Sequence, residues 1–152
     1  MMIDFIDYTD PNTTLILLNT TVEGNMKIIG SIEVYGKVNG SVETDGLSSI
    51  YGCVNGNLET RDLIARDKSV INGDVSIIYD GIIGNSSNVE GNIKCRNIEV
   101  YGNINGDIKA EDSVIIRSSA NVVGDVICRN LVVDQGAKFN GNVRLVYQFE
   151  KY

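Results

Sequence analysis

The sequence contains no histidine, and this absence removes several kinds of chemistry. Histidine is the commonest metal ligand and the usual general base near neutral pH. Acyltransferases that use a histidine base and carbonic anhydrases that bind zinc through histidine are therefore excluded. The glycines are not followed by a Lys-Ser or Lys-Thr pair, which a phosphate-binding loop would need. We expect no catalytic residue, no metal site and no cofactor.

Basic residues are few and dispersed along the chain. There are 13 Lys and Arg against 20 Asp and Glu, which gives a net charge of −7. Binding to nucleic acid depends on concentrated Lys and Arg, so we expect no nucleic-acid partner. The arginines also do not gather with acids on one groove, as they do in pectin-cleaving β-helices. The scattered arginines argue against an enzyme of that kind.

Long hydrophobic runs are absent as well. The longest early apolar run, Leu15 to Leu18, has four residues, whereas a membrane-spanning helix needs about 20. The first residues carry acids where a secretory signal carries bases. Three cysteines, an odd number, in a chain with no secretory signal indicate reduced thiols and a cytoplasmic protein.

Glycine, in contrast, is abundant, and half of the 16 glycines are regularly placed. They recur at intervals of 16, 16, 17, 18, 15, 18 and 17 residues, with an apolar residue two positions before and two positions after each one. Alternation with period two indicates a strand with one buried face. A recurrence near 17 residues indicates that each strand stacks on its copy one coil later. The eight glycines are Gly24, Gly40, Gly56, Gly73, Gly91, Gly106, Gly124 and Gly141.

This repeat predicts an all-β protein, built as a right-handed single-stranded parallel β-helix of triangular cross-section. Each coil offers about three short strands. The Asn-Gly pairs suit sharp corners, and the Asn, Asp or Ser that follows each glycine can form hydrogen bonds from coil to coil. Left-handed β-helices keep strict hexapeptides, and the variable intervals here break that phase. About eight coils of 15–18 residues would form a rod about 38 Å long.

The register also assigns places to individual side chains. Cys95 and Cys128 fall at inward positions two coils apart, about 9.6 Å, which is too far for a disulfide. Both are expected in the core, whereas Cys53 lies between inward positions and is expected to be exposed. Tyr35 and Tyr51 share one position in adjacent coils and are expected to stack. The long segment at residues 73–91 is expected to contain a bulge or an extended corner.

The recurrent pattern Gly-x-[Ile/Val]-x-Gly-[Asp/Asn/Ser]-[Ile/Val] resembles that of the bactofilins, bacterial polymer-forming cytoskeletal proteins. The closing segment at residues 136–143, Gly-Ala-Lys-Phe-Asn-Gly-Asn-Val, resembles the last coil of that family. The resemblance covers about residues 15–145. It implies a right-handed triangular β-helix that polymerises end to end into nonpolar filaments without nucleotide. It also implies a scaffold for wall-modifying or shape-determining machinery, often at the inner membrane.

The resemblance further implies where the polymer contact lies. A phenylalanine near the C-terminal end of the family's core lies at that contact, and Phe139 matches it. Apolar residues of the first and last coils are predicted to share the contact. The predicted set is Phe139, Val143, Leu145, Leu15 and Leu17.

The predicted division of the chain is an N-terminal arm at residues 1–14, a β-helix polymerisation domain at 15–145 and an aromatic C-terminal tail at 146–152. Two interpretations of the arm stay open. It covers the edge of the first coil, or it touches a membrane. The apolar residues that would do either are Met1, Ile3, Phe5 and Ile6.

The leading hypothesis is a cytoskeletal filament subunit whose main partner is a second copy of itself. Further candidate partners are the inner membrane surface and cell-wall or shape-determining proteins. The alternative is a β-helical binding scaffold that does not polymerise because its tails cap both ends. Light scattering and electron microscopy of the purified protein separate the two.

Overall fold

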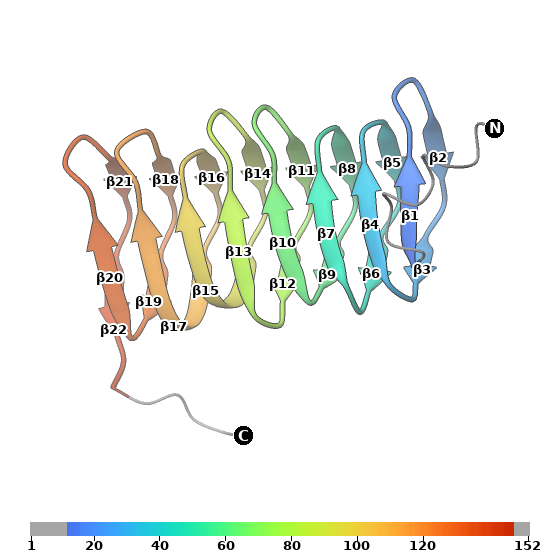
Figure 1. Cartoon of the computed structure of the whole chain (residues 1–152). Helices are drawn as coiled ribbons and strands as arrows, with labels where there is room; N and C mark the ends of the chain where they lie inside the picture. The colour runs from blue at the N-terminus through green and yellow to red at the C-terminus, as the bar shows by residue number, and fades with distance from the viewer. Residues whose placement is uncertain (1–11, 148–152) are drawn as a thin grey trace.

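The structure, a computed structural model, describes residues 12–147, which form one stack of eight coils (Figure 1). No helix occurs among them, and the strand pairs are parallel. Each coil places one strand in each of three columns, which gives the triangular cross-section predicted from the sequence. The β-helix begins at Thr13, two residues before the predicted boundary, and its last strand ends at Leu145.

The three columns together hold 22 strands. The first contains β1 (Thr13–Ile16), β4 (Ser31–Val34), β7 (Leu47–Ile50), β10 (Asp62–Ala65), β13 (Asp80–Ile83), the second halves of β15 (Ile93–Val100) and β17 (Ile108–Ile116), and β20 (Asn130–Val133). The second contains β2 (Thr21–Glu23), β5 (Lys37–Asn39), β8 (Cys53–Asn55), β11 (Val70–Asn72), β14 (Asn88–Glu90), β16 (Asn103–Asn105), β18 (Asn121–Val123) and β21 (Lys138–Asn140). The third contains β3 (Met26–Ile28), β6 (Val42–Thr44), β9 (Leu58–Thr60), β12 (Val75–Ile77), the first halves of β15 and β17, β19 (Val126–Cys128) and β22 (Val143–Leu145).

The winding is right-handed. In Figure 1 the strands of the first column run upward at the front, and the chain then crosses the top to the second column behind. The chain advances from right to left as it turns, and this combination defines a right-handed coil. Because β15 and β17 continue through a corner, the third and first columns join into one 14-stranded sheet, while the second column is an 8-stranded sheet.

Coil length varies only at two of the three corners. The corner between the second and third columns always has two residues, a glycine and a polar residue. The corner from the first to the second column has two residues, as at 35–36, or four, as at 66–69. The corner from the third to the first column has one or two. These choices account for every interval from 15 to 18 residues and leave the phase of the strands unchanged.

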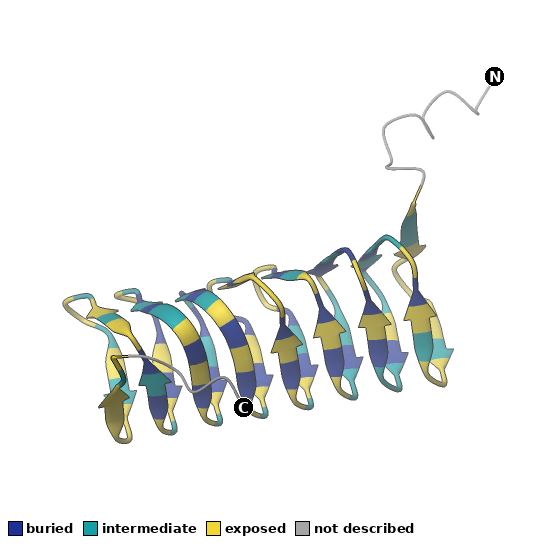
Figure 2. Ribbon diagram, turned by 90° about the horizontal axis from the view of Figure 1, so that it is seen from below, coloured by how far each residue is buried: buried dark blue, intermediate teal, exposed yellow. Residues whose placement is uncertain are grey.

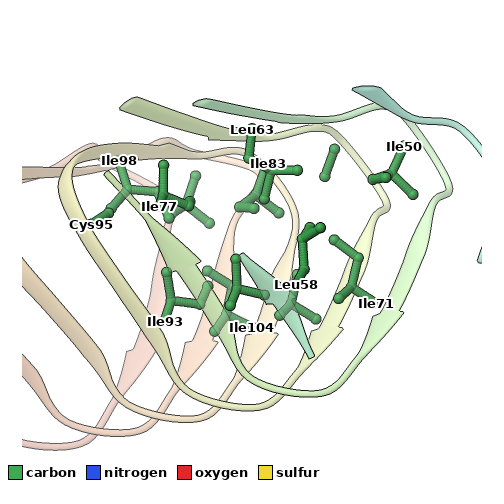
Figure 3. Packing of buried hydrophobic residues seen from close by; sticks show 14 of the residues in the cluster. Ile50, Leu58, Leu63, Ile71, Ile77, Ile83, Ile93, Cys95, Ile98 and Ile104 are labelled. Atoms are coloured by element: carbon green, nitrogen blue, oxygen red, sulfur yellow. The ribbon is translucent and has the colours of Figure 1, made fainter. Parts of the chain in front are cut away.

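The hydrophobic core fills the inside of the stack along its whole length. Figure 2 shows buried and exposed residues alternating along the strands, as a period of two requires. Figure 3 shows Ile50, Leu58, Ile71 and Ile104 pointing into this interior, where all four are fully buried. Removing such a side chain from water contributes roughly 1.5–3 kcal/mol. The predicted core positions of the cysteines are confirmed for Cys95 and Cys128, although both lie closer to the third column's corner than to its centre.

The eight repeated glycines line up along the edge between the second and third columns. All eight have positive φ, from +123° at Gly24 to +158° at Gly141. A Cβ added at Gly56 would overlap the carbonyl oxygen of Gly40 in the coil below, and the later glycines meet the same obstacle. Gly24 has no such neighbour, because no coil lies below it among residues 12–147. Glycine is therefore required at this corner both by backbone conformation and by the close stacking of coils.

The polar residue after each of these glycines connects one coil to the next. Asp74 Oδ1 accepts a hydrogen bond from the backbone N–H of Asn92 at 2.9 Å, and Asp107 Oδ1 accepts one from Asp125 at 2.8 Å. Asp125 Oδ1 in turn accepts a hydrogen bond from the backbone N–H of Asn142 at 3.0 Å. The sequence-based prediction of polar ladders along this corner is confirmed.

The long repeat at residues 73–91 contains an extended corner and not a bulge. This repeat extends its corner to four residues, 84–87, with Ser86 at a φ of +62°. The bulge lies one coil later, between β15 and β17, where the register shifts between Cys95 and Asn97. Of the two predicted forms, the extended corner is confirmed and a bulge within residues 73–91 is wrong.

Candidate functional site

The C-terminal end of the described stack leaves its backbone unpaired on one side. Strands β20, β21 and β22 pair with β17, β18 and β19, and among residues 12–147 nothing pairs with their other edge. The free edges of these three strands therefore expose unpaired N–H and C=O groups on all three sides of the triangular end. A row of open groups of this kind is a template for pairing with another chain.

The inward side chains of the same coil are exposed, although they continue core ladders. Val143 stacks on Val126 and Leu145 stacks on Cys128, and both lower residues are completely buried. In the last coil, Val143 is 44% exposed and Leu145 is 60% exposed. The cause is position and not composition, because no coil among the described residues lies above them. Docking a second surface here would bury Val143 and Leu145 as their counterparts in the coil below are buried.

Phe139 lies on β21, the strand of the second column in this coil. Its side chain stacks on Val122, packs against the core and is partly buried. The structure therefore brings Phe139, Val143 and Leu145 together around one open end. Val133 and Leu131 belong to the same end and are missing from the predicted set. Their register with Ile116 and Val114 is the signal that would have found them.

The N-terminal end has a different character. The register places Leu15 on Glu33, between the inward positions of Thr14 and Ile16, so Leu15 lies on the outer flank of the first coil. Leu17 follows in the same phase and is exposed. The inward residues of this coil include Ile16, which is nearly buried, together with the partly buried Val22 and Met26. The first coil thus exposes less of its apolar interior than the last coil does.

The remaining predicted residues at this end lie outside the described residues. Met1, Ile3, Phe5 and Ile6 were proposed as a cap or a membrane contact, and the structure describes nothing before residue 12. Both interpretations of the arm remain predictions.

The cysteines do not form a reactive site. Burial raises the pKa of the Cys95 thiol to about 12, with further contributions from Asp80, Glu111 and Cys128. Burial also raises the pKa of Cys128. Cys53 is half-buried on the outer side of β8, where its Sγ lies 3.5 Å from Asn55 Oδ1. In the part of the chain that the structure describes, no group of His, Cys, Asp or Glu could hold a metal ion.

The flank of the first column carries a ladder of aromatic and charged side chains. The rings of Tyr35 and Tyr51 stack at 4.2 Å with an interplanar angle of 11°, as predicted. Farther along, Arg117 Nε donates to Glu99 Oε2 at 2.6 Å, and the Tyr101 hydroxyl donates to the same oxygen at 2.9 Å. Burial raises the pKa of Glu99, but these two donors outweigh it and hold the pKa below its usual value. This ladder connects successive coils along one flank of the stack.

The comparisons with known proteins agree with this geometry. No helix among residues 12–147 is long and apolar enough to cross a membrane. Neither the curated proteins nor the solved structures give a match. The family model for bactofilins, described as polymer-forming cytoskeletal proteins, matches residues 68–144, which is 77 of the 152 residues. These residues include the last five repeated glycines and nearly all of the open C-terminal coil, and the chain belongs to the bactofilin family.

Proposed function

We propose that this chain is a filament subunit that assembles end to end through its C-terminal coil, and that it does so without nucleotide. The observation that carries the proposal is the contrast between the last two coils, where equivalent inward residues change from buried to exposed. A second end docked on this surface would pair the open strand edges and bury Val143 and Leu145. Edge-to-edge addition of strands supplies backbone hydrogen bonds, and the apolar ring supplies hydrophobic burial.

Such a filament would act as a scaffold. A rod whose ends carry open strand edges and apolar residues can grow without consuming a substrate. Its polar, acidic flanks stay available for other proteins. We propose that it serves cell-shape or cell-envelope machinery from the cytoplasm, at the inner face of the membrane where the N-terminal arm would contact lipid. These roles rest on the family and on the sequence of the arm.

The test replaces the apolar end residues by charged ones. Phe139→Arg and Leu145→Arg should each give short soluble species in place of filaments, because an unpaired charge in a buried contact is costly. Leu145 is exposed in the single subunit, so its replacement leaves the fold intact even if Phe139→Arg disturbs the packing of β21. Negative-stain electron microscopy and light scattering measure the outcome in nucleotide-free buffer.

A matched control places the same charge in the same coil but on its flank. Val132 is half-exposed and lies between Leu131 and Val133, with its side chain outward. Val132→Arg should leave filaments unchanged. Filaments that persist in both end variants would overturn the proposed contact. A wild-type protein that stays at the single-chain mass at high concentration would favour the capped scaffold instead.

A further inference from the structure

One flank of the rod carries a self-complementary row of charges. The central outward residues of β6, β9, β12, β15 and β17 stack in register, one per coil. All five are exposed. In chain order the row, called here the charge ladder, reads two acids, one neutral residue and two bases: Glu43, Glu59, Ser76, Lys94 and Lys109.

Within a single subunit this order is unfavourable. Glu43 lies directly beside Glu59, and Lys94 lies directly beside Lys109, in parallel strands about 4.8 Å apart. Like charges at directly paired positions of a sheet destabilise it. Lys27, which pairs with Glu43 at 3.8 Å, offsets the acidic end only in part, because both side chains are largely exposed.

A second copy laid antiparallel along this flank would reverse the situation. A two-fold axis perpendicular to the rod, passing between the Ser76 residues of the two copies, places Glu59 opposite Lys94 of the other copy and Glu43 opposite Lys109. Each of these pairs occurs twice, so four oppositely charged contacts form. The next positions outward, Lys27 and Ile127, introduce no repulsion. A parallel arrangement would instead put every charge against its own copy.

The surroundings of the axis fit a contact of this kind. An open groove of about 1960 Å³ runs beside the charge ladder, and at its middle coil it is lined by Ile78 and Tyr79. These two side chains are 60% and 45% exposed, in a corner where the neighbouring coils place charged residues. An apolar centre flanked by charges is the usual anatomy of a protein interface.

The corner beside the ladder would bring some like charges nearer to each other, including Arg61 and Arg96 of the two copies. Arg61 Nε, however, donates to Asp62 of its own chain at 2.9 Å. Asp45 likewise accepts a hydrogen bond from the backbone N–H of Gly30 at 2.7 Å. The side chains of Arg61 and Asp45 are therefore directed toward their own subunit. The central row of the strands decides the orientation.

We propose that this flank binds a second copy of the chain, antiparallel, through the charge ladder. This contact is separate from the end contact and does not require it. A face three residues wide is smaller than a standard protein interface, so pairing of single subunits should be weak. Two filaments of subunits would repeat the contact many times and hold together much more strongly.

Charge reversal tests the proposal directly. Lys94→Glu with Lys109→Glu makes all four charges of the ladder acidic, and Glu43→Lys with Glu59→Lys makes all four basic. Each double variant alone should pair at least about tenfold more weakly than the wild type, which corresponds to about 1.4 kcal/mol. An equimolar mixture of the two should pair again. The variant with all four changes inverts the ladder, restores its complementarity and should pair like the wild type.

Sedimentation velocity on chains that also carry Leu145→Arg isolates the flank from the end. The expected species has twice the chain mass of 16.6 kDa at low salt and dissociates as ionic strength rises. Circular dichroism checks that the variants remain folded, and substitutions of exposed residues should leave the spectrum unchanged. Pairing that survives either double variant, or a mixture that fails to pair, would overturn the proposal. Species larger than two chains would mean that the end contact is still formed, which contradicts the end proposal and not this one.

Discussion

Gly56 and Gly24 occupy the same corner in different coils, and both have positive φ. Within the part of the chain that the structure describes, only Gly56 has a coil below it. Gly56→Ala should therefore lower the free energy of unfolding by at least about 2 kcal/mol, from strain at positive φ and from contact with Gly40. Gly24→Ala suffers only the strain and should cost clearly less. Urea unfolding measures both, and equal costs would mean that stacking does not select glycine.

Glu99 makes stability depend on pH. Its pKa lies below the usual value in the folded state, so the unfolded chain binds more protons in the acidic range. The stabilisation is fully present above the unfolded pKa of about 4.3, and it is lost as the pH falls through the folded pKa. Thermal unfolding should show this fall, and Glu99→Gln should flatten it. Arg117→Met removes the stronger donor and should flatten it too, whereas an unchanged profile in both variants would exclude this residue as the source.

Cys53 differs from the other two cysteines in exposure. A maleimide should modify Cys53 alone in the folded protein, because Cys95 and Cys128 are buried. Mass spectrometry should show one added group before unfolding and three in denaturant. Cys53→Ser should abolish labelling of the folded chain. Rapid modification of all three native thiols would contradict the core positions.

At the scale of strands, the sequence was informative wherever apolar and polar residues alternate. Val38, Val54 and Ile104 could be assigned to the core from their distance to the nearest repeated glycine, and all are buried. Leu15 and Leu17 could not be assigned in this way. They lie in a continuous apolar run, which has no alternation and so does not reveal which residues face inward. The structure resolves this by register, because Leu15 pairs with Glu33.

The candidate contacts were harder to predict than the fold. A leucine at an inward position of the last coil has the same sequence pattern as a leucine at an inward position of a central coil. Only the central one is covered by a further coil, and the sequence pattern does not show this difference. The charge ladder needs the register of five coils, and corner lengths of one, two or four residues hide that register in the linear sequence. Phe139 was found through the family resemblance, and it is larger than the Val or Ile of other coils.

The polar residues that follow the repeated glycines stabilise the stack together, because most of them form a hydrogen bond to the next coil. Asp107→Ala removes the acceptor for the N–H of Asp125 and should lower stability by about 1 kcal/mol. Hydrogen exchange at Asp125 should speed up by several-fold. Asp107→Asn keeps an oxygen in the same place, as Asn92 does in the coil before, and should keep the protection. Equal exchange in both variants would mean that the bond is not made in solution.

At the scale of the whole molecule, the stack behaves as a one-dimensional array in which each coil contacts only its neighbours. The stability of such an array is a sum of coil and neighbour terms, so the end coils are the weakest. Amides of β20, β21 and β22 should therefore exchange faster than those of the central β13–β16 region in chains blocked by Leu145→Arg.

Assembly should change this gradient in a way that reveals which surface is used. If subunits meet end to end, the wild-type filament gives the last coil a new neighbour, and exchange in β20–β22 should slow by tenfold or more, while central strands change little. Pairing along the charge ladder alone would leave strand amides, already bonded within the sheet, almost unaffected. Hydrogen exchange of filaments and of the Leu145→Arg chain, compared at equal concentration, makes the measurement. A last coil that exchanges equally fast in both would show that the filament is built through some other face.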